Sequence, residues 1–454
     1  MTTRPRVLAA SLLAASLLFA GCGGNDGQTT TSATTTARTT STTATVATPV
    51  SAGQGVVGGP GSESDIPDTT GAPGIAGIGS TSTRGIIRPF NVSSPWNTTV
   101  TGLAVDPRSA GWLDKATRRR GVEETASAVN VRSRTVQEGL FINTRKWTTP
   151  VVDEDGAVAT RVICRQLPPY CGDGARVSSL LIPPNKDPLP QYDGWFTVLN
   201  RRQGVAYDLW RARRGGEAGN VISYQYMRKW DLNGPGYQAP NQVSARGSGL
   251  PLFAGLILPE EIQAGRIDHA LAISLPGTAQ RKYVQPASST DGVGELNSLP
   301  EGARVRLKSS VRLRFDDCPP KMQPTSRCFT ARTNRRAAQT IFTALRRYGA
   351  IVVDRSRVPT LYAELTDRWS TLLTDQNGRL LDSRGRPLSR HVRSLRNQGT
   401  PLLRGSEVQQ LHIEDFEVVR VAGSLLNFPD LQTTSTSSAR GLAAQGQTFT
   451  GGIP

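Results

Sequence analysis

Residues 195–212, WFTVLNRRQGVAYDLWRA, place two short apolar runs on either side of the polar connection Arg-Arg-Gln-Gly. This pattern predicts a β-hairpin, because a polar connection that ends in glycine can turn the chain between two strands. Further strands are expected where alternating or apolar runs stand between Gly, Pro, Asn and Asp, at residues 178–182, 222–229, 267–275, 303–308 and 350–354.

One segment, residues 333–349 (TNRRAAQTIFTALRRYG), has the period of a helix. Ala338, Ile341 and Leu345 share a helical face, and Gly349 can end the helix. Since short strands surround this segment, we expect a mainly β fold. The expected architecture is a β-sandwich or jelly-roll-like body with one or two packed helices, preceded by a disordered tether.

The first 22 residues, MTTRPRVLAASLLAASLLFAGC, have the pattern of an export signal. Arg4 and Arg6 precede an apolar run that is too short to span a bilayer, and two small residues precede Cys22. This pattern resembles the lipobox of bacterial lipoproteins, with Phe19 where leucine is usual. The alternative is an ordinary secretory signal that contains a cysteine.

The lipoprotein resemblance implies that residues 1–21 are removed and that Cys22 is diacylated. The protein is then extracytoplasmic and lipid-anchored to the bacterial cell membrane, on the outer leaflet or the periplasmic face according to the envelope type. Removal of the signal takes away two arginines and no acid, so the net charge falls from +17 to +15.

Four segments are expected: a signal peptide (1–21), a disordered tether (22–84), a β-rich body (85–430) and a disordered tail (431–454). Residues 29–52 contain twelve Thr and three Ser, with one arginine and no acid. Such a stretch buries too little apolar surface to offset its chain entropy. Within the body, residues 366–412 are interpreted as an Arg-rich insertion, because Arg379–Arg404 contains seven arginines and one acid.

Four cysteines remain once Cys22 is acylated, and an oxidising compartment favours disulfides. Three pairings are open, and the short spacings favour Cys164–Cys171 and Cys318–Cys328. A metal site built from all four is the competing interpretation, but the spacings lack CxxC and no histidine lies near them in the sequence. We therefore expect no metal and no cofactor.

The chain has no nucleophile elbow, P-loop or HExxH motif, so the candidate chemistry rests on carboxylates and aromatics of the predicted strands. Asp208 and Trp210 share one strand face, as do Tyr224, Tyr226 and Trp230. Aromatic rings can stack on sugars while carboxylates accept hydrogen bonds from hydroxyls. The alternative is that these aromatics fill the core and the acids pair with arginines.

The predicted acid–base or hydroxyl-binding pair is Asp208 and Asp231, assisted by His269 as a proton-transfer group. His269 alternates with apolar residues, so a core histidine is the other interpretation. The predicted substrate-binding residues are Trp210, Tyr224, Tyr226, Trp230 and Asp193. Asp291, in SSTDGVG, is expected to cap its own loop.

Five segments carry a further resemblance: PFNVSSPWNTTV (89–100), GSGLPLFAGLILPEEIQAGRIDHALAI (247–273), PASSTDG (286–292), LPEGARVRLK (299–308) and ALRRYGAIVVD (344–354). They resemble a widespread group of secreted bacterial proteins with a GLP…GLI…HAL block. Members often have a histidine in the PA.H segment, where this chain has Ser288 and Ser289. The group has no established activity, so the resemblance implies no catalytic residue.

Two functions are expected from these observations. The first is a surface lipoprotein that binds an extracellular or cell-wall polysaccharide, with cleavage as a further step that the sequence leaves open. The second is a non-enzymatic envelope protein whose basic lobe, Arg379–Arg404, adheres to anionic wall polymers or lipid headgroups. We expect a monomer that contacts the membrane through its N-terminal lipid, and export argues against nucleic acid as a partner.

Overall fold

The computed structural model describes residues 88–117, 139–216, 219–315, 333–389, 399–420 and 432–433. The signal peptide, Cys22, the tether, Cys318, Cys328 and nearly all of the tail lie outside the described residues. The described part is mainly strands with three α-helices, which confirms the expected fold class. No described helix has the length and apolar content needed to cross a bilayer.

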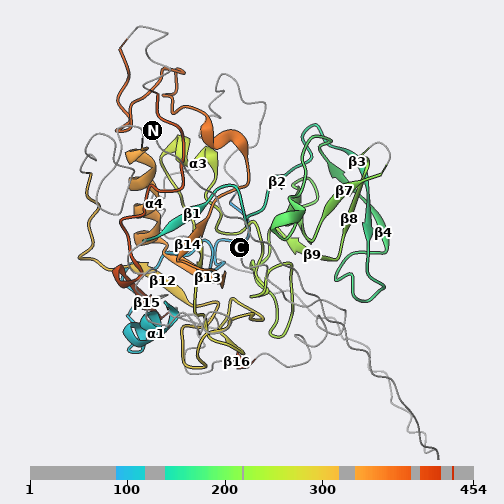
Figure 1. Cartoon of the computed structure of the whole chain (residues 1–454), viewed down its shortest axis with the longest axis horizontal. Helices are drawn as coiled ribbons and strands as arrows, with labels where there is room; N and C mark the ends of the chain where they lie inside the picture. Colours follow the sequence, from blue (N-terminus) through green and yellow to red (C-terminus); the bar gives the residue numbers. More distant parts are fainter. Residues whose placement is uncertain are drawn as a thin grey trace, which may run out of the picture. The chain divides into compact units, whose positions relative to one another are not determined.

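A six-stranded mixed sheet forms the centre of the larger part of the structure (Figure 1). Its strand order is β1-β14-β10-β13-β12-β15, in which β10 and β13 are parallel and β12 is antiparallel to β13. The strands are β1 (Phe141–Asn143), β14 (Thr360–Tyr362), β10 (Leu271–Leu275), β13 (Ala350–Arg355), β12 (Arg304–Leu307) and β15 (Phe416–Val419).

Two four-stranded sheets contain the other long strands. The first has the order β2-β5-β6-β9, with β2 (Val151–Val152), β5 (Phe196–Asn200), β6 (Val205–Trp210) and β9 (Tyr226–Asp231). The second has the order β4-β3-β8-β7, with β4 (Val177–Ile182), β3 (Val158–Cys164), β8 (Val221–Tyr224) and β7 (Arg213–Gly215). Strands β5 and β6 pair antiparallel around residues 201–204, which confirms the predicted hairpin.

The remaining elements are short. The helices are α1 (Ser109–Ala116), α3 (Pro259–Ala264) and α4 (Arg335–Arg347), and the 3-10 helices are η1 (Pro190–Tyr192), η2 (Asp367–Ser370) and η3 (Ile413–Asp415). Strand β11 (Lys282–Tyr283) pairs with β16 (Gln432–Thr433). Strand β16 is the only described part of the predicted tail.

Helix α4 confirms the predicted helix, and its ends follow from its sequence. The Asn334 side chain accepts a hydrogen bond from the backbone N of Ala337 at 2.9 Å, which caps the first turn. Gly349, with φ +67°, lets the chain turn directly into β13. Ile341 and Leu345 are fully buried against the six-stranded sheet, because residues four apart lie on one helical face.

Three cores alternate with the sheets. The first contains side chains of α1, α4 and one face of the six-stranded sheet, including Ile273 and Val352. The second joins the opposite face, including Val353, to the β2-β5-β6-β9 sheet. The third lies between the two four-stranded sheets, which therefore form a small sandwich. Neighbouring residues of β13 thus enter different cores, as the two-residue period of a strand requires.

The segment expected to form one strand at residues 222–229 is divided at Gln225. Strand β8 pairs with β3 and β7, whereas β9 pairs with β6, so the chain changes sheet at this residue. Tyr224 consequently enters the third core and Tyr226 the second, and the predicted shared face of these two side chains is wrong. A periodic pattern does not show where a strand leaves its sheet.

The predicted Cys164–Cys171 disulfide is present, next to the third core. The Arg-rich segment 366–412 is described except for residues 390–398. Its apolar residues Trp369, Leu373 and Leu403 belong to the first core, so this segment contributes to the packing of the body.

Candidate functional site

Asp208 is completely buried on β6, where three donors surround its carboxyl group. Oδ1 accepts from Thr197 Oγ1 at 2.6 Å, and Oδ2 accepts from Trp230 Nε1 at 2.8 Å and from the backbone N of Leu252 at 2.7 Å. Burial raises the pKa of Asp208 to about 6, and the three donors limit the rise. Trp230, a predicted sugar-stacking residue, therefore holds the predicted acid in place.

The other predicted binding residues on these strands do not share one surface. Asp231 is exposed, and its Oδ1 accepts from the backbone N of Asn233 at 2.9 Å in a turn. Trp210 and Tyr226 are buried in the second core, and Tyr224 is buried in the third. The aromatic side chains thus lie on both sides of the β2-β5-β6-β9 sheet.

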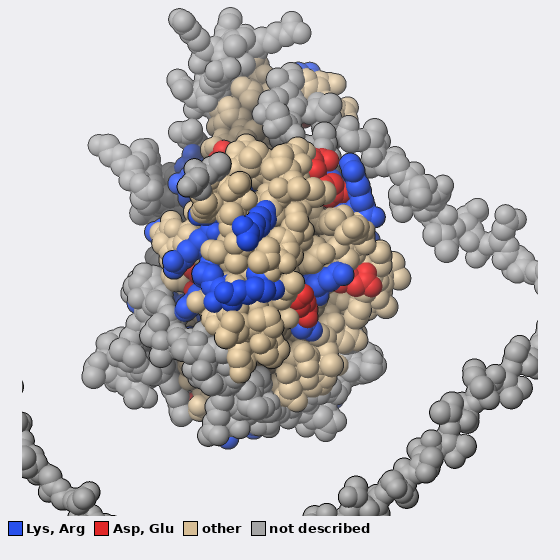
Figure 2. Space-filling view, turned by 90° about the vertical axis from the view of Figure 1, so that its right-hand side faces the viewer, with Lys and Arg blue, Asp and Glu red and all other residues tan. Residues whose placement is uncertain are grey.

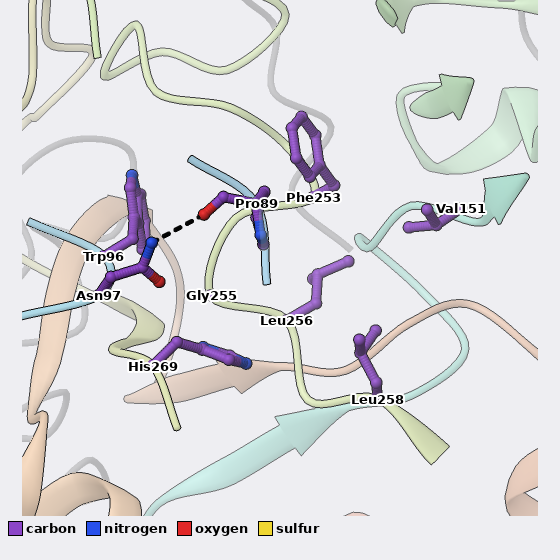
Figure 3. Close-up of a pocket in the computed structure, with 9 residues that line it drawn as sticks. All are labelled: Pro89, Trp96, Asn97, Val151, Phe253, Gly255, Leu256, Leu258 and His269. Carbon is purple, nitrogen blue, oxygen red and sulfur yellow. Dashed lines mark hydrogen bonds between the residues drawn. The ribbon is translucent and has the colours of Figure 1, made fainter. Parts of the chain in front are cut away.

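His269 lies just before β10 and lines a small, mostly apolar pocket with Pro89, Trp96, Asn97, Val151, Phe253, Gly255, Leu256 and Leu258 (Figure 3). Its Nε2 lies 2.9 Å from Glu261 Oε1, and its Nδ1 lies 2.9 Å from the carbonyl oxygen of Ala270. Burial lowers the pKa of His269, but these two contacts outweigh burial and raise it.

The pair formed by His269 and Glu261 ties two elements together. Glu261 Oε2 accepts from the backbone N of Leu258 at 3.0 Å, which caps α3, while His269 leads into β10. Asp208, Asp231 and His269 therefore have three separate sets of partners, and no described contact joins any two of them.

A different set of carboxyl groups does converge. Asp291, Glu301 and Asp354, called here the carboxyl cluster, each place one oxygen within 4.8 Å of the others. Asp354 stands near the end of β13, beside a shift of register against β10, and Glu301 stands just before β12. Because β12 is antiparallel to β13, the start of one and the end of the other meet at one edge of the sheet.

Two arginines flank the carboxyl cluster. Arg355 Nε donates to Asp291 Oδ2 at 3.0 Å, and Arg246 Nε lies 3.8 Å from Asp354 Oδ2. The guanidinium of Arg246 is buried, with the rings of Tyr362 and Trp195 at 4.9 Å and 5.2 Å from its central carbon. Two positive charges thus face three carboxyl groups.

The backbone also makes room for the cluster at Gly247. A β-carbon at this position would lie 2.5 Å from Asp291 Oδ1, so only glycine allows the carboxyl group this close to the chain. The side chain of Asp291 is 18% exposed, whereas Glu301 is completely buried. The cluster therefore reaches solvent through Asp291.

The proximity of the three groups shifts their proton affinities. Burial, and then the negative charge of Asp291, raise the pKa of Asp354 to about 8, although Arg246 and Arg355 oppose the shift. Burial, and then Asp291 and Asp354, raise the pKa of Glu301 well above its usual value. Carboxyl groups this close cannot all ionise together, so the cluster holds protons near neutral pH.

Asp193 is the one residue of the predicted binding set that adjoins the carboxyl cluster. It has a left-handed φ of +64° between η1 and β5. Burial raises the pKa of Asp193, Arg211 lowers it, and the nearby Asp291 carboxylate raises it further. It is therefore a fourth carboxyl group at the border of the cluster.

Asp291, Glu301 and Asp354 were not predicted as a site, although each lies in a segment that was quoted from the sequence. Gly247 and these three acids come from four of the five segments in which the sequence analysis expected a resemblance. Asp291 pairs with Arg355 instead of capping its loop, in which Thr290 Oγ1 accepts a hydrogen bond from the backbone N of Gly292. The usable signal was that the segments 286–292, 299–308 and 344–354 each contain a single acid, which stands beside glycine or at a strand end.

The oxygens of the carboxyl cluster are ligands of the kind that hard cations such as Ca²⁺ or Mg²⁺ prefer. The two neighbouring arginines, however, already offset two of the three negative charges. These arginines, together with the raised pKa values of Glu301 and Asp354, weaken the attraction of the cluster for a cation.

Comparison with protein-family models, with curated proteins and with solved structures finds no match to this chain.

Proposed function

We propose that this protein is a lipid-anchored, extracytoplasmic lipoprotein that binds a polysaccharide of the cell envelope or its surroundings and cleaves it with the carboxyl cluster. The observation that carries the proposal is the convergence of three carboxyl groups beside two arginines at one sheet edge. The N-terminal pattern ending in Cys22 and the Thr-rich tether support the location.

The cluster offers both members of an acid–base pair. Asp291 is the partly exposed member, and Arg355 Nε donates to its Oδ2 at 3.0 Å. Asp354 keeps its proton up to about pH 8. Near neutral pH one group can therefore accept a proton or attack carbon while its neighbour donates a proton, which is the division of labour in glycoside cleavage.

The separation of the groups indicates the course of the reaction. Inverting glycosidases keep their carboxyl groups about 6.5–9.5 Å apart to admit a water, whereas retaining enzymes hold them about 5–5.5 Å apart. One oxygen of each group in the cluster lies within 4.8 Å of the others, which is nearer to the spacing of the retaining class. We assign Asp291 as nucleophile and Asp354 as proton donor, so the product should keep the anomeric configuration of the substrate.

In the first step Asp354 gives its proton to the glycosidic oxygen, the bond from that oxygen to the anomeric carbon breaks, and Asp291 forms a bond to that carbon. In the second step water attacks the same carbon, the bond from Asp291 to that carbon breaks and releases the sugar, and the water gives one proton to Asp354. Glu301 is completely buried and does not touch the sugar.

Detergent-solubilised full-length protein, assayed for reducing ends on a panel of neutral and acidic polysaccharides, tests this function. We expect cleavage of at least one polymer, with loss in the Asp291→Asn and Asp354→Asn variants and retention in Asp231→Asn, an exposed control. Loss of cleavage in Asp231→Asn alone would assign the reaction to the site predicted from the sequence instead of the carboxyl cluster. Binding without cleavage by any variant would reduce the function to recognition.

The rival function, adhesion through Arg379–Arg404, stays a prediction. Arg379 and Arg386 pair with Asp375 and Asp382 at 2.7 Å and 2.8 Å, so two of its described cations already have acidic partners. Residues 390–398 of this segment lie outside the described part of the chain.

A further inference from the structure

The β4-β3-β8-β7 sheet has one face packed in the third core and one face turned outward. Thr160, Val162 and Cys164 of β3 point inward, so Ala159, Arg161 and Ile163 point outward. The four strands, VSSLLI, VATRVIC, VISY and RRG, contain three arginines and no acid.

Three arginines gather on or beside this outer face, called here the basic face: Arg161, Arg165 and Arg213. Arg213 stands opposite Ser223 of β8, and Arg165 Nη1 donates to the Ser223 hydroxyl at 2.9 Å. Figure 2 views the side of the molecule where β3, β4, β7 and β8 lie and shows basic side chains grouped across it, with few acidic ones.

The arginines of the basic face differ from others on the same small sandwich. Arg214 forms an ion pair with Asp187, and Arg228 forms one with Asp173 at 3.4 Å. In the described part of the chain, by contrast, neither Arg161 nor Arg165 nor Arg213 lies within ion-pair distance of a carboxylate. Arg165 Nη2 donates to the carbonyl oxygen of Arg211 at 2.6 Å, and burial, followed by the charges of Arg213 and Arg211, lowers the pKa of Arg165.

Positive charges held together without acidic partners repel one another, and an anionic ligand would relieve that repulsion. Guanidinium groups suit phosphate and carboxylate oxygens because their planar donors can bind two oxygens at once. The hydroxyls of Ser179, opposite Arg161, and of Ser223 add uncharged donors across the strands.

The outward positions favour a polymer over a bilayer. Their exposed large apolar residues are Val177 and Leu181, at 47% and 39%, and the outward positions include no Trp or Tyr. Proteins that dock on a membrane surface usually insert aromatic or large apolar side chains at the headgroup level. A flat face with arginines and serines instead suits an extended chain that lies across the strands.

We propose that the basic face binds a linear, phosphodiester-linked polyanion of the cell envelope, held by Arg161, Arg165 and Arg213. This site lies on a different sheet from the carboxyl cluster and goes beyond the proposed cleavage. It would hold the body against an anionic polymer independently of Arg379–Arg404.

Binding of fluorescently labelled poly(glycerol phosphate) to full-length protein in neutral detergent tests the proposal. We expect binding that weakens with added salt and that the Arg161→Gln/Arg213→Gln variant weakens by roughly tenfold, since each surface cation contributes modestly. The matched control is Arg202→Gln/Arg281→Gln, which removes two exposed arginines outside this sheet and should bind like the unaltered protein.

Three outcomes would overturn the proposal. Equal weakening in the test and control variants would show dependence on net charge alone. Undiminished binding in the test variant, with loss in Arg384→Gln/Arg386→Gln, would place adhesion in the Arg-rich segment. Binding of phosphatidylglycerol vesicles but not of poly(glycerol phosphate) would make the face a membrane contact. Polysaccharide cleavage should persist in Arg161→Gln/Arg213→Gln, which separates this proposal from the proposed function.

Discussion

Asp208 and Asp354 are both buried carboxyl groups, and Arg246 lies near each, but their surroundings differ. Asp208 faces three hydrogen-bond donors, and its pKa is about 6. Asp354 faces two further carboxyl groups, and its pKa is about 8. The difference teaches that burial alone does not mark a reactive acid. A buried carboxyl group that is surrounded by hydrogen-bond donors stabilises the fold. One that is surrounded by other carboxyl groups keeps its proton near neutral pH.

Asp208 and Asp354 should differ most in their effect on the rate of polysaccharide cleavage. Replacing Asp354 by Asn removes the proton donor, and we expect the rate of polysaccharide cleavage to fall by about 100-fold or more. Folding should not suffer, because the amide is neutral, like the protonated carboxyl group that it replaces. Rates and melting temperatures of Asp354→Asn and Asp208→Asn, compared side by side, check this. A similar loss of rate in both variants would remove the distinction.

In its effect on stability, by contrast, Asp208 should matter more than Asp354. Asp208→Ala leaves the donors of Thr197, Trp230 and Leu252 buried without an acceptor, which we expect to cost about 3 kcal/mol or more in the free energy of unfolding. Asp208→Asn keeps an acceptor oxygen and should lose less. Urea unfolding followed by tryptophan fluorescence measures both, and a loss below about 1 kcal/mol in Asp208→Ala would contradict a structural role.

The pH dependence of stability separates the two groups further. In the unfolded chain both lose their protons near pH 4, about the usual value for aspartic acid. The folded protein keeps the proton of Asp354 up to about pH 8, so it binds more protons than the unfolded chain between these values. Stability should therefore fall as the pH rises from about 4 to about 8 and then level off.

Asp354→Asn should remove this part of the slope, whereas Asp208→Asn should change it only between about pH 4 and the pKa of Asp208, about 6. Urea midpoints at half-unit steps of pH check the two ranges. An unchanged slope between pH 6 and 8 in Asp354→Asn would contradict the assignment to Asp354, whereas a reduced slope leaves the share of Glu301, whose pKa is also raised.

The smallest effect concerns one donor of Asp208. Thr197→Val keeps the shape of the side chain and removes only its hydroxyl, which also lies 3.3 Å from the hydroxyl of Thr149. We expect a loss of about 1 kcal/mol in the free energy of unfolding, and no loss of cleavage rate. A drop in rate comparable to that of Asp354→Asn would connect Asp208 to the chemistry after all.

Local sequence patterns predicted much of the fold. The β5–β6 hairpin, β4, β12, β13 and α4 all appear where periodicity and turn residues predict them, because these elements depend on neighbours in sequence. The division of the strand at Gln225 was not foreseeable, since it depends on which sheet each half joins. The six-stranded sheet, with its parallel β10 and β13, also depends on distant pairing.

The candidate site was less accessible to sequence reasoning. Asp208 stood beside Trp210 in a pattern that suits sugar binding, and nothing in the pattern showed that Trp230 and Leu252 would enclose it. Glu301 and Asp354 are far apart in sequence and meet only because β12 and β13 pair antiparallel. Such a cluster follows from sheet topology, which strand patterns alone do not determine.

The most direct test of the account is a pH titration of the aspartate carboxyl carbons by ¹³C NMR, in the unaltered protein and in Asp354→Asn. We predict one aspartate resonance that titrates near pH 8 in the unaltered protein and is missing from the variant. If every aspartate carboxyl group titrates below about pH 5, the cluster holds no proton at neutral pH, and the proposed acid–base chemistry is contradicted.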